Sequence, residues 1–245
     1  MWIYVVLILL IVLTTGKISK VHYRWAASML TKFEVMYTKL TTELKEHHLQ
    51  ILNTVKSNDN DRLAEGTVRL LEIGTGPGAN FRYFPKNVKV IATDPNPFFK
   101  DAFDSHKKEY PDIAVEKTII AKAEDLSEVE DNSVDVVLST LVLCSVDEVS
   151  LALKEVKRVL APGGKYVFWE HCGDAPGGWL RTIQNISDAT YWPVLVDGCH
   201  LTRDVAKEVN MAGFSKVELE QFYIPTGGNA MIKLLQSHVK GVATK

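Results

Sequence analysis

The sequence predicts an α/β protein: a single doubly wound, mostly parallel, seven-stranded sheet with helices on both faces. Three observations favour this fold. The length of 245 residues suits one large domain. Beyond Gly66, short apolar segments rich in β-branched residues alternate with helical segments. The first short segment ends in a glycine-rich turn, which is typical of a ligand site at the carboxyl edge of a parallel sheet.

The composition excludes several classes of protein. The net charge is −2, so the chain offers no broad basic face for nucleic acid. Its three cysteines, Cys144, Cys172 and Cys199, have no C-x-x-C spacing and are an odd number. They argue against both a disulfide scaffold and a zinc site. We therefore predict no metal, and we find no sequence signal for an oligomeric state.

The N-terminus is an uncharged apolar run, residues 2–16, followed by Lys17, Lys20 and Arg24. A secretory signal carries its positive charges before such a run, and a comfortable bilayer span needs about 20 apolar residues. We predict that residues 1–16 form a short, tilted or re-entrant membrane anchor with its basic flank in the cytosol. A cleaved signal peptide and a buried helix are the alternatives.

Residues 17–55 form the next predicted segment, an amphipathic helix. Its apolar residues recur every three or four positions: Val21, Trp25, Met29, Phe33, Met36, Leu40 and Leu44. This stripe suits packing on the domain, contact with a membrane, or both. The polar residues 56–66 break the pattern and are predicted to be a linker, which leaves 67–245 as the main domain.

Within the main domain, each expected element follows from its pattern of apolar residues. We expect strands at 68–73, 88–93, 114–120, 134–138, 165–169, 216–223 and 238–243. We expect helices at 78–84, 98–109, 147–160 and 202–211, the last of which is ended by Gly213.

The turn after the first strand lies in the sequence LLEIGTGPGANF, residues 70–81. Its glycines, Gly74, Gly76 and Gly78, are spaced G-x-G-x-G rather than the G-x-G-x-x-G of dinucleotide sites. A G-x-x-x-x-G-K-[ST] phosphate loop is not present in the sequence. Glu72, two residues before the turn, would repel a pyrophosphate but suits a cationic ligand. A nicotinamide oxidoreductase is therefore disfavoured.

Three further elements follow strands at the same predicted edge of the sheet. Asp94 stands 20 residues after Gly74, where an acid accepts hydrogen bonds from ribose hydroxyls; helix capping is the alternative. The sequence AKAEDL, residues 121–126, follows the third strand. Leu141 and Leu143 follow the fourth strand, either as walls of a site or as core residues.

In this order the motifs resemble those of class I, seven-strand S-adenosylmethionine-dependent methyltransferases, from Val68 to the C-terminus. GTGPGANF, DPNP, TLVLCSV, RVLAPGG, EH and DGCHLTR resemble the membrane-anchored methyltransferase-like seven, or thiol S-methyltransferase, subfamily more closely. The chain departs at Lys122, where the broad family often has Asp, and at His200, where the subfamily usually has Asn.

The resemblance implies a Rossmann-like methyltransferase fold, S-adenosylmethionine as cofactor, and a small hydrophobic thiol as substrate. It also implies residence on endoplasmic reticulum membrane and lipid droplets, with the catalytic domain facing the cytosol. The residues predicted to bind the cofactor are Glu72, Gly74, Thr75, Gly76, Gly78, Asp94, Pro95, Ala123, Glu124 and Leu141.

Transfer from the cofactor's sulfonium is an in-line displacement that depends on alignment. A thiol acceptor reacts as its thiolate, so His171 and Asp197 are candidate catalytic bases. Cys144 and Cys199 are interpreted as small apolar residues near the pocket. Two alternatives stay open: a methyltransferase acting on a lipid, sterol or quinone, and a lipid-droplet coat protein that binds the cofactor with little turnover.

Overall fold

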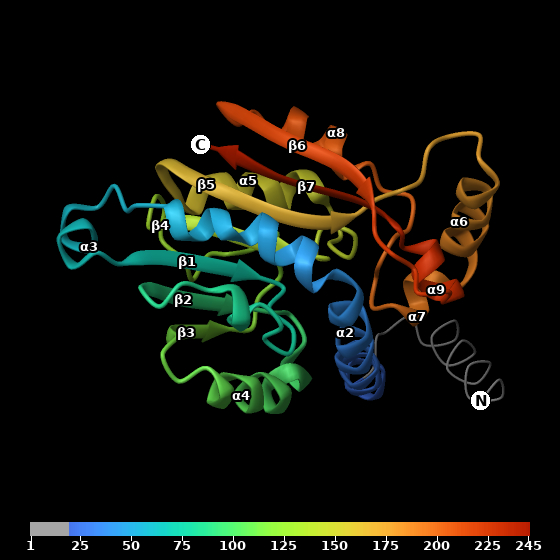
Figure 1. The fold of residues 1–245 in the computed structure, drawn as a ribbon, viewed down its shortest axis with the longest axis horizontal. Helices are drawn as coiled ribbons and strands as arrows, with labels where there is room; N and C mark the ends of the chain where they lie inside the picture. Colours follow the sequence, from blue (N-terminus) through green and yellow to red (C-terminus); the bar gives the residue numbers. More distant parts are fainter. Residues whose placement is uncertain (1–19) are drawn as a thin grey trace.

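The computed structural model describes residues 20–245, so the predicted anchor at 1–16 lies outside the described residues. Within 20–245 the strands form one seven-stranded sheet of order β3-β2-β1-β4-β5-β7-β6 (Figure 1). β7 runs antiparallel to β5 and β6, and the other pairings are parallel. The strands are β1 Val68–Ile73, β2 Val88–Thr93, β3 Ala114–Ile119, β4 Val134–Thr140, β5 Leu160–His171, β6 Lys216–Tyr223 and β7 Ser237–Thr244. The predicted fold class is confirmed.

Helices cover both faces of this sheet (Figure 1). On one face, Leu49 of α2 and Phe103 of α4 pack in a cluster with β1 and β2. On the other face, α5 and α8 pack in a second cluster with β1, β4 and β5. The helices are α2 Lys20–Leu49, α3 Asn60–Glu65, α4 Lys100–Glu109, α5 Val149–Val159, α6 Trp179–Thr190, α7 Trp192–Leu195, α8 Val205–Met211 and α9 Ala230–Leu234, with 3₁₀ turns η1 Gln50–Thr54, η2 Phe81–Tyr83 and η3 Pro97–Phe99.

The prediction of a helix at 78–84 is wrong. This segment consists of turns and the short η2. Gly78 has φ +83°, outside the helical region, and Phe84 is extended because Pro85 follows it. The glycine turn therefore does not open an α-helix, and no helix N-terminus is available there to hold a phosphate.

The amphipathic helix exists as α2, and Phe33, Met36 and Leu40 of its apolar stripe pack against the domain. None of the stripe residues is among the fully buried positions of the helix, however. Its buried residues include His22, Tyr37, Thr41 and Lys45, whereas Val21 of the stripe is 73% exposed. Burial of polar side chains is tolerated where they have partners, and the Tyr37 hydroxyl lies 2.7 Å from Nε2 of His238. Among residues 20–245, none of the helices has both the length and the apolar character to span a bilayer.

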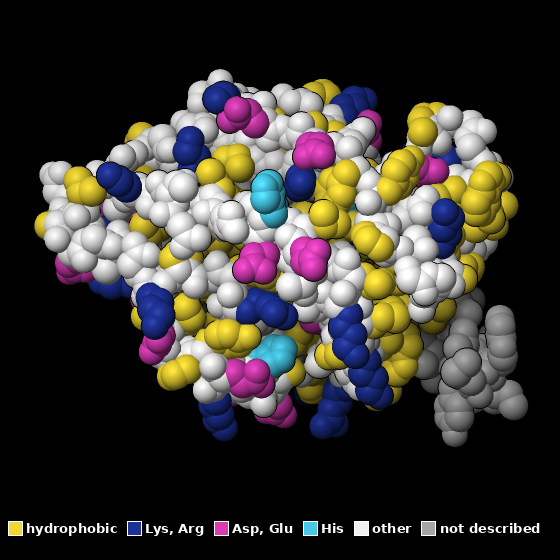
Figure 2. All heavy atoms as spheres, in the orientation of Figure 1, with side chains coloured by type: hydrophobic (Ala, Val, Ile, Leu, Met, Phe, Trp, Pro, Cys, Tyr) yellow, Lys and Arg dark blue, Asp and Glu magenta, His cyan; other side chains and the backbone are white. Residues whose placement is uncertain are grey.

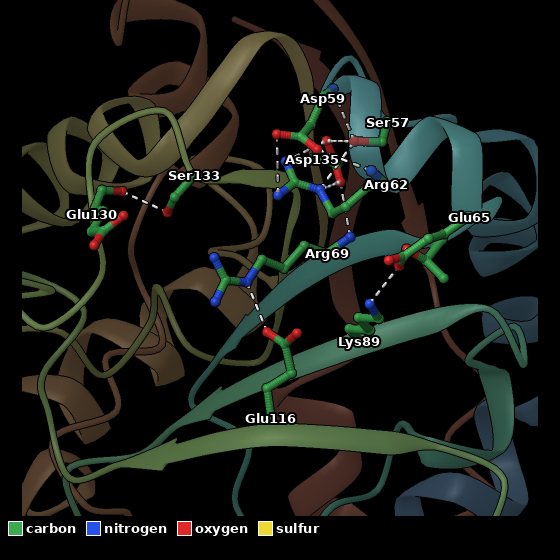
Figure 3. Close-up of polar contacts among 11 residues, drawn as sticks. Ser57, Asp59, Arg62, Glu65, Arg69, Lys89, Glu116, Glu130, Ser133 and Asp135 are labelled. Carbon is green, nitrogen blue, oxygen red and sulfur yellow. Dashed lines mark hydrogen bonds and ion pairs between the residues drawn. The ribbon is translucent and has the colours of Figure 1, made fainter.

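The polar segment 56–66 is held tightly against the sheet (Figure 3). It contains α3, whose first turn is capped by the carboxylate of Asp59. Arg62 donates from Nε to the buried carboxylate of Asp135 at 3.1 Å, and Ser57 donates to the same carboxylate at 2.7 Å. Asp135 also accepts a hydrogen bond from the backbone N–H of Arg69. The segment therefore fixes the path from α2 into β1.

We expect Arg62→Ala to lower the free energy of unfolding by about 2–3 kcal/mol, because it removes a charged partner from a buried carboxylate. Urea unfolding of the full chain measures this. Lys86→Ala is the matched control, since Lys86 pairs with Asp112 on the surface, where both side chains are exposed, and its loss should change stability little. Equal effects of the two substitutions would contradict the anchoring role of Arg62.

Candidate functional site

A cavity of about 290 Å³ lies at the carboxyl ends of the parallel strands. The loops after β1, β2, β3 and β4 line it together with the end of β5, and α2 covers it with Tyr23, Met29, Phe33 and Tyr37. A ligand at this edge is expected for an open α/β sheet. The predicted site residues that line the cavity are Gly74, Gly76, Asp94, Pro95, Ala123, Glu124, Leu141, His171 and Asp197.

The glycine turn approaches the cavity with bare backbone. Gly74 and Gly76 have φ of +61° and +52°, a region that side chains disfavour. A Cβ on Gly74 would lie 2.4 Å from Cγ2 of Val142, whereas a Cβ on Gly76 would meet nothing within 4 Å. Gly74 is therefore required for close packing against the loop after β4, and Gly76 for its conformation.

Asp94 connects the glycine turn to the loop after β2. One carboxylate oxygen accepts the backbone N–H of Gly76 at 2.9 Å, and the other accepts that of Asn96 at 2.8 Å. Each oxygen keeps a further lone pair, so the carboxylate can still accept hydrogen bonds from two hydroxyls of a ligand. Burial raises the pKa of Asp94 to about 6.

Glu72, Thr75 and Gly78 are not among the residues that line the cavity. Glu72 is buried beneath the turn, where it accepts hydrogen bonds from the Thr75 hydroxyl at 2.6 Å and from Nδ2 of Asn80 at 2.5 Å. Burial raises its pKa to about 7. A Cβ on Gly78 would lie 2.5 Å from the ring of Phe81. These three residues shape the turn, and their direct contact with a cofactor stays a prediction.

The loop after β4 is held by a second buried acid, Glu170 on β5. Its carboxylate accepts the Ser139 hydroxyl at 2.6 Å and the backbone N–H groups of Val142 and Leu143 at 2.8 and 3.1 Å. Between these points Leu141 has φ +58°, which is unusual for a branched side chain. Leu141 lines the cavity, so Glu170 holds it there against backbone strain.

Ala123 and Glu124 approach the cavity from the loop after β3. The Glu124 carboxylate accepts the backbone N–H groups of Asp147 and Glu148, just before α5 begins. Lys122, the departure from the family pattern, forms an ion pair with Asp147. The AKAEDL segment, residues 121–126, is therefore fixed to the start of α5.

His171 and two cysteines lie together at one end of the cavity. Nε2 of His171 is 3.1 Å from Sγ of Cys199, and the ligand atoms of Cys144, His171 and Cys199 lie within 4.8 Å of one another. All three side chains are buried. The neighbouring Cys199 and burial raise the pKa of the Cys144 thiol well above its ordinary value. Sequence reasoning placed the cysteines near the pocket but missed this cluster, because its members lie far apart in the sequence, in the loop after β4, at the end of β5 and in the loop after α7.

Asp197 lines the cavity from the loop after α7. It has φ +46°, and one of its oxygens lies 3.8 Å from Nε2 of His22. Burial raises the pKa of the Asp197 carboxyl. The two candidate bases therefore line one cavity, with His171 in contact with sulfur and Asp197 beside α2.

Comparison with known proteins identifies the family. A methyltransferase-domain family model matches residues 71–168. Thiol S-methyltransferase TMT1B of Rattus norvegicus is 36% identical over 89% of this chain and 88% of its own length. Thiol S-methyltransferase TMT1A of Homo sapiens is 34% identical over 94% of this chain and 90% of its own length. The chain belongs to the S-adenosylmethionine-dependent methyltransferases.

Solved structures show the same fold in other methyltransferases. One from Thermotoga maritima, described as a possible histamine N-methyltransferase, has a TM-score of 0.59 at 17% identity and covers 91% of this chain and 99% of its own. A putative methyltransferase of Haloferax volcanii, solved with the Trm112 activator, has a TM-score of 0.62 at 18% identity, covering 91% of this chain and 96% of its own.

The geometry of this methyltransferase fits its cofactor, S-adenosylmethionine. The lone pairs that Asp94 keeps free suit the two ribose hydroxyls. Because Gly74 and Gly76 have no side chains, a ligand can approach their backbone directly. No α-helix begins at the glycine turn, so the turn offers no helix N-terminus to a phosphate. This agrees with a cofactor whose nucleoside carries no phosphate.

Sequence reasoning missed the contribution of α2 to the methyltransferase site. Tyr23, Met29, Phe33 and Tyr37 line the cavity from a helix that we assigned to a separate segment. The backbone carbonyl of Tyr23 accepts from Nδ2 of Asn96, which ties α2 to the loop after β2. Met29 and Phe33 belong to the apolar stripe of α2, but their spacing does not indicate that the helix covers a site.

We expect Gly74→Ala to lower kcat/KM of the methyltransferase about tenfold, because the added Cβ collides with Val142 and disfavours the positive φ. The double variant Gly74→Ala/Val142→Ala should recover part of this loss, since it removes the two closest methyl groups. Gly177→Ala is the control: it has a similar φ of +84° but an open surrounding outside the cavity. An unchanged kcat/KM in Gly74→Ala would contradict the close-packing argument.

Proposed function

We propose that this methyltransferase transfers the methyl group of S-adenosylmethionine to the sulfur of small aliphatic or alkyl thiols. The observation that carries the proposal is the composition of the cavity beyond the glycine turn. Leu30, Phe33, Leu141, Trp192 and Met231 line it together with the Cys144–His171–Cys199 group. An apolar wall suits an alkyl chain, and the relatives at 34–39% identity are named thiol S-methyltransferases.

The chemistry asks two things of the chain. It must align the acceptor sulfur with the sulfonium methyl, which can supply up to about 7–11 kcal/mol of the barrier reduction. It must also let the thiol lose its proton, since the free thiol pKa is about 8.5. His171 and Asp197, the predicted bases, both line the cavity. His171 is in contact with the sulfur of Cys199, so we assign the acceptor end of the cavity to that cluster.

A screen of acceptors tests this function. Purified full-length protein with labelled S-adenosylmethionine should methylate alkyl thiols and leave amines, phenols and catechols unmodified. Methylation of a lipid, sterol or quinone with no thiol product would favour the runner-up enzyme, which the same apolar wall suits. Cofactor binding without any methylated product would favour a cofactor-binding coat protein.

We further propose that the enzyme works at the cytosolic surface of endoplasmic reticulum membrane and lipid droplets. Two observations support this. The first is the apolar run at residues 2–16. The second is α6, which exposes Trp179, Ile183 and Ile186 along one row while Leu180 faces inward. Figure 2 shows hydrophobic side chains gathered over α6 at the right edge of the molecule.

Fluorescent fusions and fractionation test the location. The full chain should be recovered with membranes and, after lipid loading, with droplets. Removal of residues 1–16 should release most of it, and Trp179→Ser/Ile183→Ser should weaken what attachment remains. Unchanged membrane recovery after both changes would contradict the proposal.

A further inference from the structure

The spacing of the cysteines along the sequence predicts no metal, but in the fold Cys144, His171 and Cys199 form a group with the composition of a metal site. Their ligand atoms lie within 4.8 Å of one another, and all three side chains are buried. Two thiolates and one imidazole form a ligand set used by zinc when a fourth position is kept open for a reactant. Because Zn–S bonds are about 2.3 Å and Zn–N bonds about 2.0–2.1 Å, tetrahedral coordination needs only a small contraction of the cluster.

The surroundings of the cluster restrict what these side chains can do. Nδ1 of His171 makes no hydrogen bond within the described part of the chain, so the polar contacts of this ring lie on its sulfur side. Nε1 of Trp192 donates to Sγ of Cys199 at 3.2 Å. Such a donor stabilises a thiolate and orients it. His238 lies nearby but its Nε2 is already engaged with the Tyr37 hydroxyl.

The position of the cluster indicates which ligands a bound metal would contact. All three residues line the cavity that Gly74, Gly76 and Asp94 line from the cofactor side. A ligand entering this cavity can therefore reach the open coordination position. A zinc bound by two thiolates has no net charge, and a third thiolate makes the centre negative. That charge suits a cationic sulfonium beside it.

We propose that Cys144, His171 and Cys199 bind one Zn²⁺ whose fourth ligand is the sulfur of the substrate thiol. The role of the fourth ligand rests on the proposed thiol methylation, and with zinc bound His171 serves as a ligand and not as the base. On binding, a Zn–S bond forms, the S–H bond breaks and the proton goes to solvent. The sulfur then attacks the methyl carbon: a C–S bond forms and the sulfonium C–S bond breaks. The products are a neutral thioether, which is a weak zinc ligand and leaves, and neutral S-adenosylhomocysteine.

Cobalt substitution tests the site without relying on activity. Full-length protein, reduced and freed of metal with a chelator, is titrated with Co²⁺. We expect one Co²⁺ per chain and a sulfur-to-cobalt charge-transfer band in the near ultraviolet. Addition of an alkyl thiol should intensify that band. Cys144→Ala and Cys199→Ala should each weaken Co²⁺ binding about tenfold or more and reduce the band.

Cys172→Ala is the matched control. Cys172 is also buried and is adjacent to His171 in sequence, but its Sγ contacts the Ser237 hydroxyl rather than the cluster. This variant should bind Co²⁺ as the wild type does. X-ray absorption of the zinc-loaded wild type adds a test that needs no variant, with two sulfur and one nitrogen ligands expected. Absence of the band in the wild type, or its loss only in Cys172→Ala, would overturn the proposal.

Activity with and without zinc separates this inference from the proposed function. If chelated protein methylates thiols at the full rate, the zinc role is wrong and thiol methylation stands. If Co²⁺ binds at the three residues but no thiol is methylated and no thiol alters the band, the metal site stands while the thiol substrate and its place as fourth ligand are wrong. Restoration of thiol methylation by Zn²⁺ supports both.

Discussion

Asp94→Ala is expected to weaken binding of S-adenosylmethionine by about 30- to 100-fold, roughly 2–3 kcal/mol. The carboxylate acts in two ways. It offers charged acceptors to the ribose hydroxyls, and it accepts the N–H groups of Gly76 and Asn96, which fixes the two loops relative to each other. Alanine loses both functions, and it leaves two backbone donors near the cavity without their partner.

Calorimetric titration of the full chain with S-adenosylmethionine measures the loss, and S-adenosylhomocysteine distinguishes its origin. A similar weakening for both ligands places the loss at the adenosine part that they share, and not at the sulfonium. Asp104→Ala is the control for net charge, since Asp104 is exposed on α4 and pairs with Lys100. An affinity within about threefold of the wild type in Asp94→Ala would contradict the assigned role.

The central strands β1, β2 and β4 were predictable from sequence because they are buried on both faces and carry a nearly continuous apolar run. The edge strands β3 and β6 are largely exposed, and their patterns are weaker. β1, β2 and β6 begin and end where expected. β5 begins earlier, at Leu160 instead of 165, because the Pro162-Gly163-Gly164 segment lies within an irregular pairing with β4 rather than in a loop. Short apolar patterns therefore locate strands well, but they do not define irregular ends.

The grouping of the residues predicted to bind the cofactor was predictable because they follow consecutive strands, and parallel strands bring their carboxyl ends to one edge. Gly74, Asp94 and Ala123 line one cavity for this reason. The acceptor side was not predictable in the same way. α2 lies outside the repeating strand–helix pattern, so nothing in its spacing indicates that Tyr37 reaches His238 or that Phe33 lines the cavity.

Glu170 shows a further limit of sequence reasoning, since its role depends on three partners that are 27 to 31 residues away in the chain. We expect Glu170→Ala to lower the free energy of unfolding by about 3–5 kcal/mol, because the Ser139 hydroxyl and the N–H groups of Val142 and Leu143 are left buried without their acceptor. Release of Leu141 from its strained φ should also reduce kcat/KM. Chemical unfolding and steady-state kinetics on the same preparations measure the two effects.

Glu170→Gln separates the hydrogen bonds of this side chain from its charge. Burial raises the pKa of Glu170 to about 7, above the ordinary value of 4.5. The folded state therefore binds the proton of Glu170 more tightly than the unfolded state does. The stabilisation that this tighter binding gives the folded state is complete below about pH 4.5 and is lost as the pH rises through 7. A pKa shift of that size corresponds to a change of at most about 3 kcal/mol in the free energy of unfolding.

The wild type should consequently lose stability between pH 5 and pH 8, and Glu170→Gln should lose less. Glutamine keeps an oxygen for the N–H groups of Val142 and Leu143 and does not ionise. A residual decline is expected in this variant because burial also raises the pKa of Glu72 to about 7, and Glu72→Gln added to Glu170→Gln should flatten the profile further. An identical pH profile in the wild type and in Glu170→Gln would mean that Glu170 does not titrate in this range, and its carboxylate would then be held ionised by the three donors that surround it.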